Sequence, residues 1–369
     1  MKYFIYMMYG FEKLPSAAPH QATIIHLIYC KIFRRSCSSL ISNSLCSLSL
    51  SLLQTIAVVG STGSQGGSTI PHLLQLGAKV RALTRDPTKP AAEALAKLDG
   101  VEVVQADPFD AASMESAFAG CHGVFQVTFF WSHMDMHKEK QEVEIATAAA
   151  KKAGVTHYIY STLPGLNEGA FAKTVPAIHG TAVPHFDMKA ACDKLVEGQF
   201  PIASLVMAGC YWDNFMNFGI MNRTEGKLTI VTSLPEGGMI PGLCLDDFGQ
   251  VVAQMFNAGD ASNGKKVFVV SESLTPATLA AQASEILGEE VNNSLVPPEI
   301  YRTFPFPGAD DLGNMWCAFG HKEFTDIVET YSGKPGETPI WETTYGVKAT
   351  PFKVWCAAHQ DALKKIGAA

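Results

Sequence analysis

The chain has 369 residues, of which 47% are apolar and 17% are charged, a composition that is ordinary for a soluble globular protein with one large α/β domain or two small ones. Its net charge of −7 argues against nucleic acid as a partner, because binding a phosphate backbone requires a basic face. Its nine cysteines form no C-x-x-C pair, which argues against a disulfide framework and against a zinc site.

Residues 1–53 differ in composition from the rest of the chain. Glu12 is their only acidic residue, basic residues cluster at Lys31, Arg34 and Arg35, and a run of Ser and Leu follows. Such a leader is typical either of a targeting extension with transit-peptide character or of an unstructured extension of the gene model. The Ser/Leu run is too polar to span a membrane, so we expect no membrane partner.

From residue 54 onward, short apolar strands alternate with helices. The predicted strands are 55–59, 79–83, 101–105, 123–127, 157–161 and 202–207. The predicted helices between them are 68–76, 90–98, 111–118, 136–153 and 187–198. This alternation is typical of an α/β protein with a Rossmann-type doubly wound parallel sheet, because each parallel connection needs a crossover. We place the NAD(P)-binding Rossmann domain at residues 54–207.

The regular alternation ends after residue 207. Residues 208–369 are rich in Pro and Gly, and helices are predicted at 246–256, 275–287 and 352–365. Such a segment usually caps the carboxyl edge of the sheet, where a substrate pocket lies. We therefore expect a smaller C-terminal α/β subdomain that binds a substrate or a partner and is interleaved with the Rossmann part.

A glycine-rich loop follows the first predicted strand. It reads Gly60-Ser61-Thr62-Gly63-Ser64-Gln65-Gly66, a G-x-x-G-x-x-G pattern. Gly60 permits the tight turn, Gly63 lets backbone N–H groups approach phosphates, and Gly66 lets the helix pack on the strand. The helix N-terminus adds partial positive charge toward the phosphates. The loop therefore predicts a dinucleotide site, and a purely structural turn is the alternative.

The end of the second predicted strand indicates which dinucleotide binds. An NAD-binding protein usually carries Asp or Glu there for the ribose 2′-hydroxyl. This chain carries Arg85 and then Lys89, which can bind a 2′-phosphate, so the predicted cofactor is NADP(H). The alternatives are that Asp86 pairs with Arg85, or that both basic residues are ordinary surface charges.

Further candidate contacts follow the third and fourth strands. Asp107 stands where a side chain often contacts the adenine, and it could equally cap the next helix. Thr128, Phe129 and Phe130 follow the fourth strand. An apolar wall for the ribose and nicotinamide, or ordinary core aromatics, would explain these three residues equally well.

One histidine pair has the spacing of metal ligands. His133 and His137 would share a helix face, with Asp135 between them and Glu139 beyond. No third ligand can be placed from the sequence, and the start of a solvated helix explains the same residues. We therefore predict no metal site.

Seven stretches carry a resemblance to a known family: VVGSTGSQGGS, VRALTRDPTKPAA, VEVVQADPFD, HYIYSTL, HFDMK, CYWDNF and FPGADDLGNMW. On these stretches, which extend from residue 55 to residue 320, the chain resembles the NmrA-like family of atypical short-chain dehydrogenases/reductases. The last stretch is distinctive of the family's NADP(H)-sensing redox sensors. The resemblance implies a Rossmann fold and bound NADP(H).

The resemblance also assigns cofactor contacts to particular residues. They are Gly60, Ser61, Thr62, Gly63, Ser64 and Gln65 in the glycine loop, Arg85 and Lys89 for the 2′-phosphate, Asp107 and Pro108 for the adenine, Thr128, Phe129 and Phe130 after the fourth strand, the active-site lysine position Lys189, and Tyr211, Trp212, Asp213 and Asn214 beside the nicotinamide. One position departs from the family, because a lysine that members can carry after strand four is Glu144 here. That departure puts one cofactor contact in question.

The catalytic pair of the superfamily is incomplete in this chain. Active short-chain reductases use Tyr-x-x-x-Lys, in which the lysine lowers the pKa of the tyrosine so that the phenol can protonate a carbonyl oxygen. Here the segment is His185-Phe186-Asp187-Met188-Lys189, so histidine replaces the tyrosine. His185 is either a structural residue or a proton donor of different reach, and Lys189 either assists catalysis or holds the ribose.

Two functions therefore remain. In the first, the chain is a non-catalytic NADP(H) sensor whose conformation or regulatory protein partner follows the NADPH/NADP+ ratio. In the second, it is an NADPH-dependent reductase of a quinone, enone or carbonyl compound, with Lys189 or His185 as the acid. We favour the sensor. The resemblance allows a homodimer, and we expect a cytoplasmic protein that can also enter the nucleus.

Overall fold

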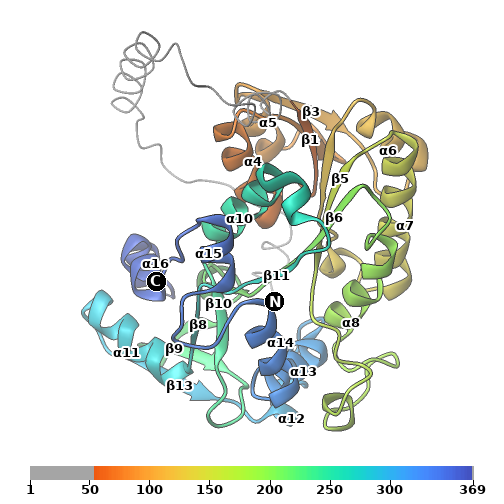
Figure 1. Cartoon of the computed structure of the whole chain (residues 1–369). Helices are drawn as coiled ribbons and strands as arrows, with labels where there is room; N and C mark the ends of the chain where they lie inside the picture. Colours follow the sequence, from red (N-terminus) through yellow and green to blue (C-terminus); the bar gives the residue numbers. More distant parts are fainter. Residues whose placement is uncertain (1–53, 368–369) are drawn as a thin grey trace, which may run out of the picture. The chain divides into compact units, whose positions relative to one another are not determined.

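The structure, a computed structural model, describes residues 54–367, so the leader predicted for residues 1–53 lies outside the described residues. Its main feature is a seven-stranded sheet with the strand order β11-β6-β5-β4-β1-β2-β3 (Figure 1). Neighbouring strands of this sheet are parallel throughout. The order reverses between β1 and β4, and ligands of doubly wound sheets bind at such a point, outside the carboxyl ends of the strands. The predicted Rossmann-type α/β sheet is confirmed.

The strands of this sheet are short, and the central ones are buried. They are β1 (Thr55–Val59), β2 (Lys79–Thr84), β3 (Val101–Gln105), β4 (Gly123–Gln126), β5 (His157–Thr162), β6 (Ile202–Ala208) and β11 (Lys266–Val269). β1, β4 and β5 are buried along almost their whole length, because helices cover both faces of the sheet. The first six strands match their predicted ranges to within one residue. β11 lies beyond residue 207, so the chain returns to the Rossmann sheet after it has begun the C-terminal subdomain.

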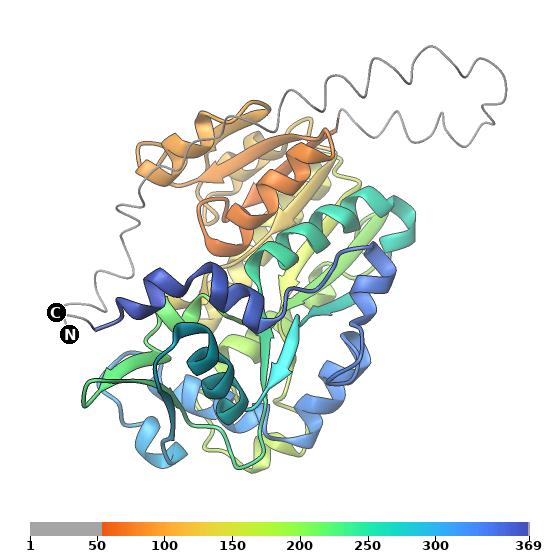
Figure 2. The same ribbon diagram turned by 90° about the vertical axis from the view of Figure 1, so that its left-hand side faces the viewer.

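Helices form one layer on each face of the sheet (Figure 1 and Figure 2). They are α4 (Ser64–Gln75) and α10 (Leu245–Ala258) on one face, and α6 (Ala111–Phe118), α7 (Met136–Lys152) and α8 (Pro184–Ala191) on the other, with α5 (Pro90–Ala96) against β3. Ile70 and Val251 of the first layer share an apolar core with Val58 of β1. Val143 and Tyr158 belong to a second core, under α6 and α7.

The remaining elements build a smaller α/β part, as predicted, and its apolar core also takes in Phe186 of α8, Met207 of β6 and Phe268 of β11. Its strands are β7 (Cys210–Tyr211), β10 (Ile240–Leu243) and β12 (Glu272–Leu274) in one sheet, and β8 (Met221–Thr224), β9 (Lys227–Thr232) and β13 (Val291–Leu295) in another. Its helices are α9 (Asn214–Asn217), α11 (Pro276–Leu287), α12 (Pro298–Tyr301), α13 (Ala309–Phe319), α14 (Lys322–Tyr331), α15 (Ile340–Tyr345), α16 (Phe352–Ala358) and α17 (Gln360–Lys364). Over residues 54–367, no helix has the length and apolar character needed to cross a membrane.

Two helices begin earlier than predicted, and both differences concern the candidate site. α4 begins at Ser64 rather than at residue 68, although glycines are poor helix formers. The first turn of this helix packs so closely on Gly60 that position 66 has no room for a Cβ, so the glycine lies inside the helix. α8 begins at Pro184 rather than at residue 187, since proline is well suited to the first position of a helix. His185 and Lys189 therefore share α8, and residues four apart lie on the same face.

Replacing Gly66 by Ala is expected to destabilise the protein by about 1–3 kcal/mol, because the new Cβ would collide with the carbonyl oxygen of Gly60. Gly67 is the matched control in the same helix, where a Cβ would lie 3.7 Å from the carbonyl oxygen of Ser61. Ala at position 67 should stabilise the helix by about 0.5–1 kcal/mol. Urea denaturation measures both effects, and equal free energies of unfolding for the two variants would contradict the close packing.

Candidate functional site

The predicted glycine loop joins β1 to α4 at the carboxyl edge of the sheet. Gly60 has a φ of +77°, which other residues rarely adopt, and a Cβ there would lie 3.2 Å from the carbonyl oxygen of Val127. The amide of Gly63 donates to the carbonyl oxygen of Gly60 over 3.0 Å and closes the turn. Thr62, Gly63 and Ser64 are exposed, and the first turn of α4 carries no acidic residue. The loop thus exposes a helix N-terminus that suits an anion.

Two polar side chains of the loop hold it in place. The hydroxyl of Ser61 donates to the carbonyl oxygen of Leu83 over 2.7 Å. The amide nitrogen of Gln65 donates to the hydroxyl of Tyr211 over 2.6 Å, and its amide oxygen accepts from the hydroxyl of Ser161 over 2.6 Å. Burial raises the pKa of Tyr211 to about 12, so its phenol is protonated at neutral pH. These contacts occupy the side chains of Ser61 and Gln65, so their backbone groups are the parts left to face a ligand.

An open pocket of about 400 Å³ lies beyond the ends of β2, β3 and β4. It is lined by Arg85, Phe109, Ser132, His133, Lys138 and Gln141. Arg85 and Lys138 bring positive charge to it, as a site for a phosphate group requires. Lys89, the other predicted phosphate contact, is exposed at the start of α5 and lies outside this lining.

Asp86 does not neutralise Arg85 in this arrangement. Its carboxylate accepts hydrogen bonds from the hydroxyl and the amide of Thr88, over 2.6 and 3.0 Å. These hydrogen bonds lower the pKa of Asp86, so the carboxylate is ionised and turned toward its own loop. The alternative that Asp86 pairs with Arg85 has no support in the geometry.

The residues after β3 border the same pocket. Asp107 is exposed, and its carboxylate accepts from the amide of Phe109, a pocket residue, over 3.0 Å. Pro108 is half-buried between them. The cap of α6 is Asp110, whose side chain accepts from the amide of Ala112. The alternative that Asp107 caps the helix is therefore wrong, because the cap residue directly precedes the first turn.

The three residues after β4 have different environments. Thr128 is 4% exposed, Phe129 is 52% exposed and Phe130 is 3% exposed. Phe130 packs edge-on against Trp131 and His133, with ring centroids 5.5 and 6.0 Å away. Of the two aromatic residues, Phe129 therefore offers an open face to a ligand, whereas Phe130 is a core residue.

Lys189 is bound on all sides at the end of β4. Its ammonium group donates to the carbonyl oxygen and the hydroxyl of Thr128, and to a carboxylate oxygen of Glu139 over 2.6 Å. The hydroxyl of Thr128 donates to the same carboxylate oxygen over 2.5 Å. Lys189 is 9% exposed and Glu139 is 0% exposed. The three hydrogen-bond donors of the ammonium group are thus all used inside the protein.

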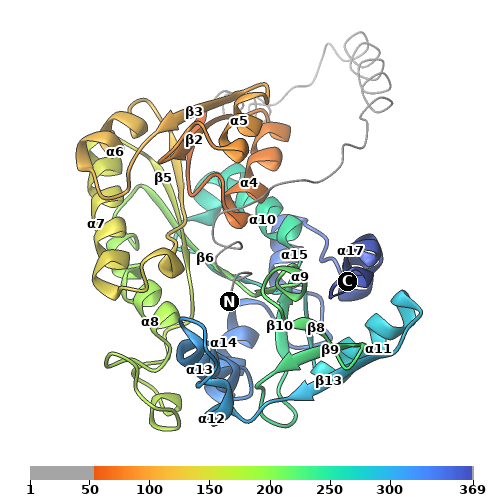
Figure 3. The ribbon, with the colours of Figure 1, turned by 180° about the vertical axis from the view of Figure 1, so that it is seen from behind.

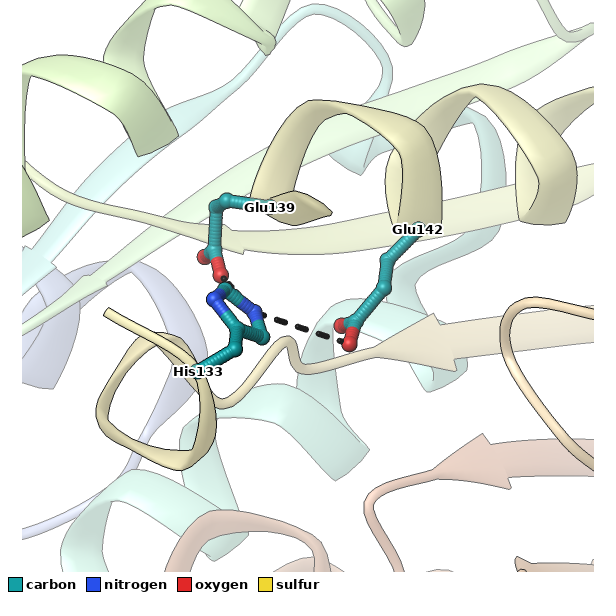
Figure 4. A group of neighbouring side chains, drawn as sticks. All are labelled: His133, Glu139 and Glu142. Atoms are coloured by element: carbon teal, nitrogen blue, oxygen red, sulfur yellow. Dashed lines mark ion pairs between the residues drawn. The ribbon is translucent and has the colours of Figure 1, made fainter. Parts of the chain in front are cut away.

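Glu139 also belongs to a buried group with Glu142 of the same helix and His133 of the preceding segment (Figure 4). His133 Nε2 lies 3.5 Å from Glu139 Oε2 and 3.7 Å from Glu142 Oε1. Burial opposes the charge of Glu139, but Lys189 and the hydrogen bonds to His133, Lys189 and Thr128 outweigh it and lower the pKa of Glu139 to about 2. Burial, and then the charge of Glu139, raise the pKa of Glu142 to about 7. The acid pair therefore gains its second charge near neutral pH.

These three side chains have the donor types of a metal site, and their ligand atoms lie within 4.8 Å of one another. The tautomer of His133 argues against a metal ion. Its Nδ1 accepts a hydrogen bond from the amide of Asp135 over 3.0 Å, so the proton of the neutral ring is on Nε2. Nε2 therefore carries that proton, faces the two carboxylates at 3.5 and 3.7 Å, and has no lone pair to offer a metal. His137 and Asp135 of the sequence pattern form the start of α7, where Asp135 accepts from the amide of His137.

His185 lies one turn before Lys189 in α8 and is held from the C-terminal part. Its Nδ1 lies 2.7 Å from Asp311 Oδ1, and its amide donates to Asp311 Oδ2 over 3.1 Å. The rings of Trp131 and Phe186 lie 4.8 and 4.6 Å from the ring of His185. Asp311 belongs to α13, so it is the FPGADDLGNMW stretch that binds the histidine of the incomplete catalytic pair.

The four residues predicted beside the nicotinamide divide into two groups. Tyr211, half-buried, reaches the glycine loop through Gln65. Asp213 and Asn214 are also half-buried, at the start of α9. Trp212 is 0% exposed and packs edge-on against Phe352 with ring centroids 5.0 Å apart, so its side chain belongs to the core of the C-terminal part. The predicted cofactor contact of Trp212 therefore does not fit the placement of its side chain.

Three acidic residues of the site were not predicted to belong to it: Glu142, Asp311 and Glu139, which was named only beside the pair of His133 and His137. Glu139 and Glu142 lie on the buried face of α7 beside Val143, and acidic residues on an apolar helix face are a signal that the sequence contained. Asp311 lies inside the stretch that was singled out for its resemblance. Its proximity to His185 joins positions far apart in the chain, and only the folded structure brings them together.

Replacing Glu142 by Gln should raise stability at alkaline pH. Because the pKa of Glu142 is raised to about 7, the protonated form stabilises the fold fully below about pH 4.5, and this contribution is lost as the pH rises through 7. Gln mimics the neutral acid at every pH. The difference in the free energy of unfolding between the variant and the wild type should therefore grow by on the order of 1–3 kcal/mol as the pH rises from 5 to 8.

Glu144→Gln is the matched control on the same helix, since Glu144 is half-exposed and paired with Lys140 at the surface. Its difference from the wild type should not change over this pH range. Thermal denaturation at several pH values measures both variants. A Glu142→Gln curve that stays parallel to the wild type would contradict the buried acid pair.

Known proteins resemble this chain in sequence and in fold. The NmrA-like family matches residues 53–350. An NmrA-like family domain-containing oxidoreductase of Aspergillus hancockii is 28% identical over 289 residues, which cover 73% of this chain and 83% of that protein.

Two solved structures share the fold. The crystal structure of NmrA, a negative transcriptional regulator, in complex with NADP superposes with a TM-score of 0.70 at 22% identity, over 86% of this chain and 98% of that one. Triphenylmethane reductase of Citrobacter sp. in complex with NADP(H) superposes with a TM-score of 0.62 at 23% identity, over 83% of this chain and 99% of that one. The matched range, the doubly wound sheet and the glycine loop together show that this chain belongs to the NmrA-like family.

Proposed function

We propose that this chain is an NADP(H)-binding redox sensor whose conformation follows the NADPH/NADP+ ratio. A regulatory protein or a second copy of the chain would read that conformation. Two observations carry the proposal. The exposed glycine loop and the open pocket at Arg85, together called the groove below, suit a dinucleotide, and the catalytic pair is both incomplete and occupied by internal contacts.

The groove fits a dinucleotide with a 2′-phosphate. The exposed turn of Gly60 and Gly63 and the N-terminus of α4 suit the pyrophosphate, because a helix N-terminus carries partial positive charge. A side chain at position 60 would meet Val127, so this turn requires glycine there. The pocket that contains Arg85 and Lys138 suits the 2′-phosphate. NmrA and triphenylmethane reductase, which share the fold, were crystallised with NADP and NADP(H).

The active-site lysine position favours sensing over catalysis. In active short-chain reductases the lysine assists a tyrosine, and here neither group is available for that role. Histidine replaces the tyrosine, and the ammonium of Lys189 is bound to Thr128 and Glu139. The nicotinamide of NADP+ carries one positive charge more than that of NADPH. A buried ammonium–carboxylate pair at this position would respond to that difference, because like charges repel strongly where water is excluded.

A second candidate function is an NADPH-dependent reductase of a quinone, enone or carbonyl compound. The observation that favours it is the pair of His185 and Asp311, which could supply the missing proton donor. Relatives such as the Aspergillus hancockii protein are named oxidoreductases.

Arg85→Ala should weaken NADPH binding tenfold or more, because a charged hydrogen bond to a phosphate contributes about 1.5–3 kcal/mol. NADH lacks the 2′-phosphate, so its affinity should stay within about twofold and serves as the internal control. Isothermal titration with both nucleotides measures the ratio. An unchanged preference for NADPH over NADH would contradict the role given to Arg85.

NADPH and NADP+ should produce different hydrogen-exchange protection in residues 128–142 and 183–191, the segments that meet at Lys189 and Glu139. Adenosine 2′,5′-bisphosphate, which lacks the nicotinamide, is the control ligand and should protect only the phosphate end of the groove. Glu139→Gln should abolish the difference, because it removes the carboxylate that pairs with Lys189. Identical protection by both redox forms in the wild type would overturn the sensor.

A further inference from the structure

The first turns of α7 present one face to the open pocket and another to the protein interior. Lys138 and Gln141, three residues apart, are exposed and line the pocket. Glu139 and Glu142, the next residue in each case, are 0% and 7% exposed. Residues three apart lie on the same side of a helix. One side of α7 therefore brings a cation to the pocket, and the adjacent side carries a buried pair of acids.

His133 connects the pocket with the two acids. Its side chain lines the pocket, and its Nε2 lies 3.5 Å from Glu139 Oε2 and 3.7 Å from Glu142 Oε1. Figure 4 shows the carboxylate ends of both glutamates directed toward this ring. A ligand that contacts His133 in the pocket is therefore separated from the acid pair by a single side chain.

The two acids have unequal partners. Glu139 pairs with Lys189 and accepts from Thr128, so it is held as an anion and its pKa is lowered to about 2. Within residues 54–367, no hydrogen bond reaches the carboxyl group of Glu142, whose polar neighbour is His133. Burial and then the charge of Glu139 raise the pKa of Glu142 to about 7. Glu142 is thus the member of the pair whose charge changes near neutral pH.

The charge of Glu142 depends on groups from several elements. α7 packs against α6 and α8 (Figure 3). The titratable groups that act on Glu142 are Glu139 of the same helix, His133 of the preceding segment, Lys189 of α8 and Arg85 after β2. Arg85 also lines the pocket. It is therefore a cation that a ligand in the pocket and Glu142 share.

The other elements packed against α7 have their charges paired elsewhere. From α6, Glu115 pairs with Lys152, the last residue of α7. From η5 (Asp193–Leu195), Asp193 pairs with Lys266 over 2.7 Å. β4 offers the neutral amide of Gln126. The charge balance at the acid pair is therefore set by α8, by the residues of the pocket and by what the pocket binds.

A phosphate group in the pocket and an ionised Glu142 compete for the charge of Arg85. Arg85 favours the ionised carboxylate of Glu142. A phosphate that binds Arg85 neutralises this cation and adds negative charge beside a buried site, where like charges repel strongly. Phosphate binding therefore favours the protonated acid. By linkage, the protonated acid favours phosphate binding to the same extent.

We propose that Glu142 is a specificity-determining residue of the groove. Its protonated form permits recognition of the 2′-phosphate of NADP(H), and its ionised form weakens that recognition without affecting NAD(H). The preference for NADP(H) over NAD(H) then falls as the pH rises through neutrality. This inference rests on the proposed binding of NADP(H), but not on the proposed response to the redox state of the nicotinamide.

Proton uptake measures the coupling directly. At about pH 7.5 more than half of Glu142 is ionised, whereas the 2′-phosphate, with a second pKa of about 6, is already a dianion. Isothermal titration of the full-length chain with NADPH, in two buffers of different ionisation enthalpy, should show uptake of on the order of half a proton. NADH should cause none. Adenosine 2′,5′-bisphosphate should reproduce the uptake, because it carries the 2′-phosphate without the nicotinamide.

The affinities give a second readout. From about pH 7 to about pH 9, the Kd of the wild type for NADPH should rise roughly three- to tenfold, while the Kd for NADH stays within about twofold. Glu142→Gln is neutral at every pH, so it should bind NADPH without pH dependence and without proton uptake. Glu115→Gln removes a surface acid of the neighbouring helix and should behave like the wild type.

Infrared difference spectroscopy detects the acid itself and needs no change in affinity. Addition of adenosine 2′,5′-bisphosphate to the wild type at about pH 7.5 should increase the C=O band of a protonated carboxylic acid. Glu142→Gln should lack this increase, and Glu115→Gln should keep it. A purely structural role of Glu142 would produce no such band in the wild type and would overturn the proposal.

The outcomes separate this inference from the proposed function. Equal proton uptake by Glu142→Gln and the wild type, or a wild-type preference for NADPH over NADH that does not change with pH, would overturn the role of Glu142. The redox sensor would still stand if NADPH and NADP+ protect the chain differently. A chain that binds neither NADPH nor adenosine 2′,5′-bisphosphate overturns both proposals.

Discussion

The buried pair of Lys189 and Glu139 is the interaction on which the candidate site depends. Removing two charges from water costs several kcal/mol per ion, and only close contact with additional hydrogen bonds offsets that cost. Thr128 supplies those bonds through its hydroxyl and its carbonyl oxygen. The end of β4 and the first turns of α7 and α8 must therefore meet in one arrangement, which places the groove, the aromatic residues after β4 and the face of α8 relative to one another.

The same pair explains why the neighbouring groups behave as they do. Its own burial, and then the charge of the ionised Glu139, keep Glu142 from ionising at its ordinary pH and raise its pKa to about 7. Lys189 is occupied by its contact with Glu139, and His185, one turn earlier on α8, is bonded to Asp311. The C-terminal part supports this face through Asp311 and Asn314, which bond to His185 and to the segment before it. The site that the sequence predicts at the edge of the Rossmann sheet is thus completed by α13 of the C-terminal part.

The elements that the sequence predicted well are those with local signals. β1, β4 and β5 are continuous buried runs, and Gly60 and Gly66 have the conformation and the close contacts that the glycine pattern implies. The errors arise where tertiary packing overrides local propensity. α4 begins within its glycines, and Trp212 packs in the core although its neighbour Tyr211 faces the loop.

The sequence by itself determined the doubly wound sheet, the glycine loop, the basic residue after β2 and the replacement of tyrosine by His185, because each depends on neighbouring residues and their periodicity. Only the tertiary structure decided what surrounds those residues. The contacts of Lys189 with Glu139 and of His185 with Asp311 join residues that lie 50 and 126 positions apart in the chain. No local pattern encodes such contacts, since they exist only when the folded sheet brings separate helices to one edge.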